Sequence, residues 1–211
     1  MVTAPVDRDR YHHGDLRAAL LGAGMELVRE RGVDGFTLRE VARRAGVSHN
    51  APYHHFRDRS ALVAVIVIEG FEAFTRSLES AARRARGDQL DRIRALGRAY
   101  VRFAREDPER FKLLWRPDMR QGAELEAVEA AGQRSYEPLL AALRTGREAD
   151  EVDGSVDAEM QALAAWSEVH GLAMLLIDGP LRLETISAQE ADRLIDGVIT
   201  TLVRGLAPRD G

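Results

Sequence analysis

The sequence predicts an all-α protein of about nine helices: an N-terminal three-helix helix-turn-helix domain followed by a C-terminal helical bundle. Apolar residues recur at helical spacing along almost the whole chain, and no alternating strand pattern bounded by hairpin turns is present. Capping residues, glycines and prolines divide the 211 residues into segments of helical length. Hydrophobic residues make up 45% of the chain, enough for a sizeable core.

Start and stop signals place four helices before residue 85. Thr37 and Glu40 form a capping box, in which each side chain satisfies a free backbone N–H of the other residue. Gly46 follows as a residue able to adopt the left-handed conformation of a tight turn. Ser48 is a good N-cap. The four helices are expected over about 15–31, 37–45, from Ser48 onward, and over about 58–84.

Five further helices are expected over about 90–105, 108–115, 124–147, 157–177 and 187–206. Asp107-Pro108 supplies an N-cap followed by a proline at the first helical position. Pro138 is expected to bend the third of these helices. Ser187 and Glu190 predict a second capping box at the start of the last.

Composition excludes several classes of function. The chain has no cysteine, which excludes disulfides and zinc–thiolate sites and fits a reducing compartment. Its N-terminus is polar and charged, so we expect no signal peptide, and no apolar run approaches the length of a membrane span. We therefore expect a cytoplasmic protein with no membrane association, no cofactor and no metal.

The segment from Thr37 to Arg59 indicates DNA binding. A short helix, a turn on Gly46 and a second helix rich in polar and aromatic residues form a helix-turn-helix, whose second helix enters the major groove. The charge distribution agrees, because residues 1–60 carry ten Arg against eight acids, whereas the whole chain has a net charge of −4.

These residues resemble a known family. Residues 11–75 resemble the DNA-binding domain of the tetracycline-repressor (TetR) family of bacterial transcriptional regulators, with Arg59 where relatives usually have Lys. The resemblance rests on Thr37, Val41, Ala42, Ala45, Gly46, Val47, Ser48, Tyr53, His55, Phe56, Arg59 and Leu62. Trp166, His170 and Gly171 also resemble the Trp-x-x-x-His-Gly signature of one TetR subgroup. The resemblance implies a DNA-binding domain over 1–60, a connecting helix over about 59–84, and an effector-binding and dimerisation domain over 85–211.

The DNA-binding residues are assigned from position and chemistry. Asn50 is expected to read a base edge, because its amide can pair with adenine, and Tyr53 and His54 are expected at the DNA backbone. Thr37 suits a phosphate oxygen at a helix N-terminus, although it also fits a role as a cap alone. The full set is Thr37, Arg39, Arg43, Ser48, His49, Asn50, Ala51, Tyr53, His54 and Arg59. A metal site at His54 and His55 is not expected, because no carboxylate lies at ligand spacing.

The second domain is expected to bind a small-molecule effector. Trp166, His170 and Met174 share one helix face, which fits either a pocket wall or a core histidine with a hydrogen-bond partner; core stripes are the commoner case. By family architecture, the expected effector-binding residues are Phe111, Trp115, Met119, Tyr136, Trp166, His170 and Met174.

The resemblance further implies a homodimer formed by the last two helices, which would place two recognition helices on a near-palindromic double-stranded DNA operator. The interface is expected to contain Leu163, Leu194, Ile195, Val198 and Leu202. We expect a repressor that an unknown small-molecule effector releases from DNA. The alternatives are an activator of the same family or, more remotely, a helical enzyme or an adaptor without DNA binding. The sequence contains no nucleophile elbow and no glycine-rich phosphate loop preceded by a strand.

Overall fold

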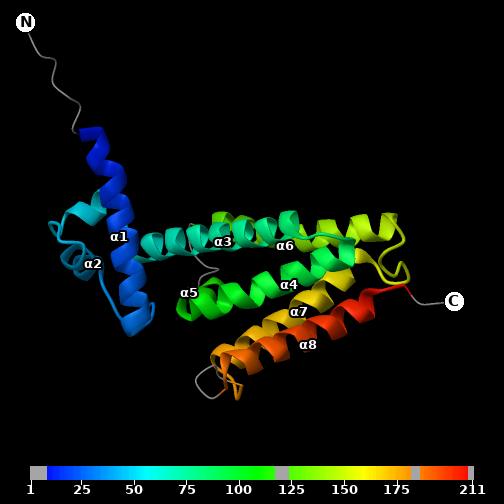
Figure 1. The fold of residues 1–211 in the computed structure, drawn as a ribbon. Coiled ribbons are helices and arrows are strands. Elements are labelled where there is room, and N and C mark those ends of the chain that lie inside the picture. Colours follow the sequence, from blue (N-terminus) through cyan, green and yellow to red (C-terminus); the bar gives the residue numbers. More distant parts are fainter. Residues whose placement is uncertain (1–8, 117–123, 182–185, 209–211) are drawn as a thin grey trace, which may run out of the picture. The chain divides into compact units, whose positions relative to one another are not determined.

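The all-α prediction is confirmed by the structure, a computed structural model that describes residues 9–116, 124–181 and 186–208, with side chains from Leu16 onward. Within these ranges every regular element is helical (Figure 1). The elements are α1 (Asp9–Arg31), α2 (Leu38–Arg44), the 3-10 helix η1 (Ala51–His54), α3 (Arg59–Arg84), α4 (Gln89–Glu106), α5 (Pro108–Leu114), α6 (Leu125–Glu148), α7 (Ala158–Ile177) and α8 (Ala188–Leu206).

The helix ends follow the capping signals closely. The side chains of Asp88, Asp107 and Asp157 each accept a backbone N–H at the start of a helix, and so does that of Ser187. At Ser187 only half of the predicted box forms, because the Glu190 N–H donates to the serine hydroxyl without a described return bond. The first helix is longer than predicted, since it begins at Asp9 rather than near Asp15.

The chain divides into two compact units. The first comprises residues 1–69 and 116–128, and so contains α1, α2, η1 and the beginning of α3. Its core holds Leu20, Leu27, Val41 and Leu62, none more than 1% exposed. Gly24 lets α1 lie close to α3, because a Cβ there would stand 2.7 Å from Leu62 Cδ2.

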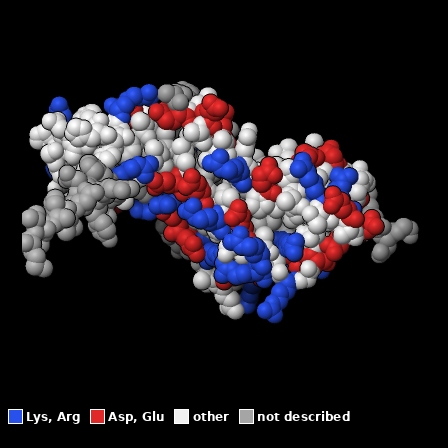
Figure 2. Space-filling view, turned by 90° about the horizontal axis from the view of Figure 1, so that it is seen from above, with Lys and Arg blue, Asp and Glu red and all other residues white. Residues whose placement is uncertain are grey.

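The second unit comprises residues 70–115 and 129–211. Helices α4, α7 and α8 lie side by side in it (Figure 1). Gly97 of α4 brings α8 close, since a Cβ there would lie 3.3 Å from Ile199. Along the edge of that contact, Arg98 pairs with Asp196 at 2.8 Å and Arg105 with Asp192. Figure 2 shows basic and acidic side chains interspersed on the face viewed from above.

Two of the predicted interface residues belong to the core of this unit. Ile195 and Leu202 are 6% and 8% exposed and lie on the buried stripe of α8. Their spacing predicted an apolar face correctly, but that face covers the chain's own core, so these two leave little surface for a second copy. Leu194 and Val198 are half-buried, and Leu163 of α7 is 46% exposed.

Helix α7 is apolar on more than one side. Among the described helices, α7 alone is long and apolar enough to cross a membrane. The core helix of a globular protein can have the same length and composition. One face, which includes Ala165, Val169 and Leu172, is buried against the rest of the unit. Met160, Leu163 and Leu175 lie exposed instead. Packing in the core therefore explains the apolar residues on one face of α7. The apolar residues on the other face remain exposed.

Replacing Leu27 tests the packing of α1. Leu27→Ala would remove a 1%-exposed side chain between helices, and we expect the free energy of unfolding to fall by about 2–5 kcal/mol. The matched control Leu27→Met keeps the volume and should cost less than about 1.5 kcal/mol. Chemical denaturation followed by circular dichroism would measure both changes. Equal, small losses in the two variants would show that α1 is not packed as described.

Candidate functional site

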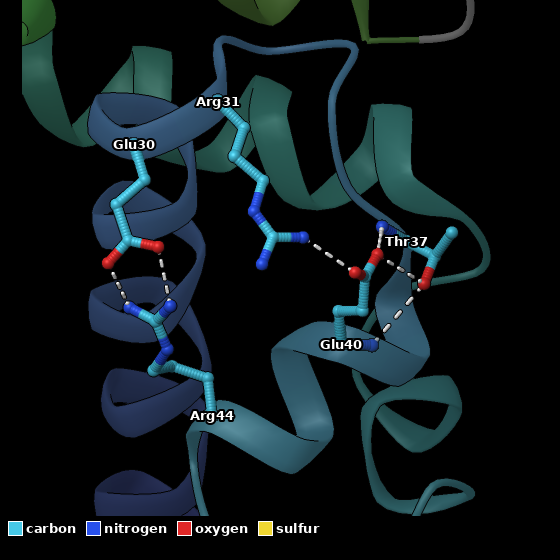
Figure 3. A network of polar contacts seen from close by, with 5 residues as sticks. All are labelled: Glu30, Arg31, Thr37, Glu40 and Arg44. Carbon is cyan, nitrogen blue, oxygen red and sulfur yellow. Dashed lines mark hydrogen bonds and ion pairs between the residues drawn. The ribbon is translucent and has the colours of Figure 1, made fainter.

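The predicted capping box fixes the start of α2. The Glu40 N–H donates to the Thr37 hydroxyl oxygen at 3.3 Å, and the Glu40 carboxylate accepts from the Thr37 N–H at 2.9 Å (Figure 3). Arg31 of α1 donates to the other carboxylate oxygen at 2.7 Å. These bonds, the one from the Thr37 backbone first, hold the pKa of Glu40 below its usual range. The Thr37 hydroxyl and N–H are therefore already engaged within the chain.

Arg44 ties the other end of α2 to α1. Its guanidinium forms a bidentate pair with Glu30, at 2.7 and 2.6 Å (Figure 3). It also donates to Glu26 at 3.1 Å. The hydrogen bond from Arg44 lowers the pKa of the Glu30 carboxyl. Because both ends of α2 are tied to α1, the turn that follows α2 begins from a fixed place.

The turn after α2 forms as expected, but the third helix is shorter than predicted. Gly46 has φ +70°, the left-handed conformation that favours glycine, and Val47 N–H closes the turn onto the Ala42 carbonyl at 3.0 Å. The helix expected from Ser48 is only a 3-10 turn at Ala51–His54, with Asn50 rather than Ser48 at its N-cap position.

Pro52 explains this correction. It has no N–H, so it cannot donate to the Ser48 carbonyl as an α-helix would require. The backbone instead uses the shorter 3-10 pattern: Ala51 N–H donates to Ser48 and Tyr53 N–H to Asn50. Pro52 is buried together with Phe56, which anchors the turn to the core.

We call residues 48–55 the recognition turn. Its outer side exposes Ser48, His49, Asn50, Tyr53 and His54, with Tyr53 51% exposed, while Ala51 is half-buried. Among the residues that the structure describes, the Asn50 side chain has no hydrogen-bond partner, so its amide is free to pair with another molecule. The recognition turn thus has an exposed polar side and an anchored apolar side.

The arginines of this unit fall into two groups. Arg39 and Arg43 lie one helical turn apart on α2, exposed and without an ion pair to any described residue. Arg59 is half-buried and internally bonded: it donates to the Val33 carbonyl at 2.9 Å and pairs with Asp34 at 3.1 Å. Its predicted phosphate contact would have to compete with these partners, whereas Arg39 and Arg43 are unencumbered.

The second unit brings most of the predicted effector residues together. The rings of Trp115 and His170 lie 5.4 Å apart between centroids, and Trp166 lies at a similar distance from each. Phe111 is fully buried against the same group, and Tyr136 reaches its edge, 6.4 Å from Trp166. Met174 is half-buried on α7. Met119 lies outside the described residues.

Tyr100 of α4 is the member that sequence reasoning missed. Its hydroxyl oxygen accepts the Trp166 indole N–H at 3.1 Å and lies 2.8 Å from His170 Nδ1. Because that oxygen already accepts one bond, the hydroxyl proton is best placed on the bond to Nδ1, which puts the imidazole proton on Nε2. The one available signal was a hydroxyl on the apolar stripe of α4, which requires a buried partner.

Burial keeps this cluster uncharged. It lowers the pKa of the His170 imidazole and raises the pKa of the Tyr100 hydroxyl, so both are neutral at pH 7. No hydrogen bond joins His170 to a carboxylate in the described part of the chain, and no group of three or more His, Asp or Glu side chains there is placed to hold a metal ion. His170 has the hydrogen-bond partner expected of a core histidine, and its ring is half-buried, which leaves both the core and the pocket-wall interpretation open.

Comparisons with known proteins cover both units. A family model described as "Bacterial regulatory proteins, tetR family" matches residues 20–66, and one described as "Tetracyclin repressor-like, C-terminal domain" matches residues 93–202. Among solved structures, a protein of unknown function from Rhodococcus sp. RHA1 is 35% identical, with a TM-score of 0.81 over 95% of this chain and 100% of that one.

Two further structures share the fold at lower identity. The TetR family transcriptional regulator PfmR from Thermus thermophilus is 22% identical, with a TM-score of 0.69 over 88% of this chain and 97% of that one. AibR, in complex with isovaleryl coenzyme A and operator DNA, is 17% identical, with a TM-score of 0.71 over 89% of this chain and 98% of that one. With a helix-turn-helix matched at one end and a repressor-like domain at the other, this chain belongs to the TetR family of DNA-binding bacterial transcriptional regulators.

Proposed function

We propose that this regulator is a cytoplasmic repressor that binds a near-palindromic operator as a homodimer and is released by a small-molecule effector. The observation that carries the proposal is the recognition turn, whose exposed polar side stands on a buried Pro52 and Phe56. A polar surface anchored in this way can approach base edges without losing its geometry. An adaptor without DNA binding would gain nothing from it.

Each exposed group has a role in this proposal. Asn50 reads a base edge, with His49 beside it, and Tyr53 and His54 contact the DNA backbone. Arg39 and Arg43 neutralise phosphates, since no described partner occupies them. We also assign Thr37, Ser48, Ala51 and Arg59 to the DNA-binding surface. Thr37 and Arg59 also hold internal bonds, so we assign them weaker contributions to DNA affinity.

The uncovered face of α7 supports the dimer. Met160, Leu163 and Leu175 are 54%, 46% and 43% exposed, a cost that a second copy would relieve. Gly171 lies between them, and a Cβ there would meet nothing within 4 Å. On α8, Gly197 and Gly205 are equally open. Small residues beside large apolar ones allow two helices to pack closely, as a two-fold interface between α7 and α8 of two chains requires.

The aromatic cluster supports an effector site in the second unit. Trp115, Trp166, His170 and Tyr136 are half-buried rather than sealed in the core, so they border both the interior and the surface. AibR was solved with both an acyl coenzyme A and operator DNA, which supports a fold of this kind carrying effector and DNA together. Effector binding would favour a dimer state with a different spacing of the recognition turns, and operator affinity would fall.

An activator and an enzyme remain distinguishable by experiment. An electrophoretic shift with the promoter beside the protein's own gene tests DNA binding, and transcription from that promoter in the presence and absence of the protein separates repression from activation. Turnover of a substrate without DNA binding would favour an enzyme. Absence of a shift at any promoter in a genome-wide binding map would contradict the proposed function.

Arg43→Ala tests the phosphate contact. We expect weaker binding to all DNA sequences and a shallower salt dependence, by about 0.9 in the slope of log K against log salt for each phosphate that the variant no longer neutralises. The control Arg102→Ala changes the net charge equally at an exposed position of α4 and should leave the slope unchanged. Fluorescence anisotropy over a salt series measures both. Identical slopes for the two variants would argue against the contact.

Asn50→Ala tests base reading. The variant should keep its non-specific affinity but lose discrimination at one base pair of each half-site, by about 1–3 kcal/mol. Selection of bound sequences from a random pool would show this as a single degenerate position. An unchanged sequence preference would mean that Asn50 does not contact a base.

Gly171→Arg tests the dimer. The open space at Gly171 should leave the fold of one chain intact while a charged side chain blocks the partner helix, so we expect a monomer in sedimentation velocity. Gly22→Arg is the matched control, because Gly22 is also exposed in a helix with nothing within 4 Å, and this variant should remain dimeric. A dimeric Gly171→Arg protein would place the interface elsewhere.

A further inference from the structure

One buried donor in the aromatic cluster has no partner. The indole Nε1 of Trp115 is shielded from solvent, and the structure gives it no hydrogen bond. Buried N–H groups are nearly always hydrogen-bonded, because an unpaired one loses its hydrogen bonds to water and gains none in the protein. Trp115 stands at the C-terminal end of α5, and its residue as a whole is only half-buried. The unpaired donor is therefore a buried atom of a side chain that is itself partly exposed.

A second donor lies on the neighbouring ring of His170. With the Tyr100 hydroxyl bonded to His170 Nδ1, the imidazole proton resides on Nε2, and no described residue bonds to that nitrogen. The Trp115 and His170 rings lie 5.4 Å apart between centroids, at an angle of 76°. Two unpaired N–H groups thus stand on neighbouring rings. Tyr100 already accepts from Trp166, so the cluster presents chiefly donors to an incoming molecule.

The surroundings of these donors are aromatic and uncharged. The rings around Trp115 are those of Phe71, Phe74, Phe111, Trp166 and His170. The hydrogen bonds in this cluster join its uncharged side chains to one another, Trp166 to Tyr100 and Tyr100 to His170. Burial disfavours a carboxylate or phosphate among these rings, and it also lowers the pKa of His170, so the imidazole is not charged to offset such an anion.

We propose that the effector carries an uncharged hydrogen-bond acceptor, a carbonyl oxygen of an ester, lactone, ketone or amide, that binds Trp115 Nε1–H with His170 Nε2–H as the second donor. The apolar body of the molecule packs against the surrounding rings. This inference rests on the proposed function in one respect, that the aromatic cluster is the effector site. Trp166 and Tyr100 then act as positioning residues, since Trp166 holds the Tyr100 hydroxyl and Tyr100 sets the tautomer of His170, the second donor.

The chain is suited to a direct test, because its only two tryptophans both belong to the cluster. Three probes share one ring: methyl benzoate offers a carbonyl, sec-butylbenzene offers none, and benzoate carries a charge. In the full-length protein labelled with 15N-tryptophan, methyl benzoate should move the Trp115 indole proton downfield, while the Trp166 proton, already bonded to Tyr100, moves less. Sec-butylbenzene should produce no such downfield shift.

Affinity gives a second measurement. Methyl benzoate should bind more tightly than benzoate. The variant Trp115→Phe, which keeps a ring but removes the donor, should lower the affinity for methyl benzoate roughly threefold to tenfold. The hydrocarbon should bind wild type and variant equally, which controls for a change in packing. Equal loss for ester and hydrocarbon, tighter binding of benzoate, or no indole shift with the ester would overturn the assignment.

Operator binding separates this inference from the proposed function. Operator affinity is measured first without a probe, and then with saturating ester. A protein that binds its operator but fails the indole test overturns the ligand class alone. A protein that passes the indole test but keeps its operator at saturating ester overturns the effector role of the cluster, while the carbonyl-binding site itself stands.

Discussion

The apolar character of α7 is the constraint on which the second unit depends. A helix that is apolar on several sides must be covered on each of them, and α4 and α8 cover one side. The same packing holds Trp166 and His170 against Tyr100, and so sets the aromatic cluster. What remains is the face with Met160, Leu163 and Leu175, for which the proposed second copy is the cover. Core, proposed sensor and proposed interface therefore meet on one helix.

In the first unit, ion pairs within the chain occupy some arginine side chains and leave others available to bind DNA. Exposed pairs contribute little to stability, but here they fix orientation: Arg31 and Arg44 hold both ends of α2 against α1. Arg39 and Arg43 stay outside this network. The acids of this unit are largely neutralised by other arginines: Glu30 pairs with Arg44, Glu40 with Arg31 and Asp34 with Arg59. The small net positive charge of residues 1–60 therefore understates the positive charge that Arg39 and Arg43 present to DNA.

Most of the fold could be predicted from local signals in the sequence. The capping box at Thr37, the glycine turn at Gly46 and the Asp caps act over three or four residues, so the sequence alone locates them. The recognition turn lies where the sequence predicts a helix, but it is a 3-10 turn, because Pro52 has no N–H to donate in an α-helix. These are properties of neighbours along the chain.

The site depended on contacts that sequence spacing does not encode. Tyr100 bonds to Trp166 and His170, which lie 66 and 70 positions further along the chain. Arg59 bonds to Val33, which lies 26 positions before it. The stripe of α8 shows a second limit: an apolar face fits the chain's own core as well as a partner, and only burial assigns Ile195 and Leu202 to the core. The unpaired Trp115 nitrogen could not be predicted, since it is defined by what three-dimensional packing leaves out.

Operator recognition as proposed requires two recognition turns on one duplex. Hydroxyl-radical footprinting on an operator found by binding-site mapping measures this directly. We expect two protected patches on one face of the DNA, with centres about 34–36 Å apart, and two chains bound. A single patch from one chain, or protection without that spacing, would contradict it.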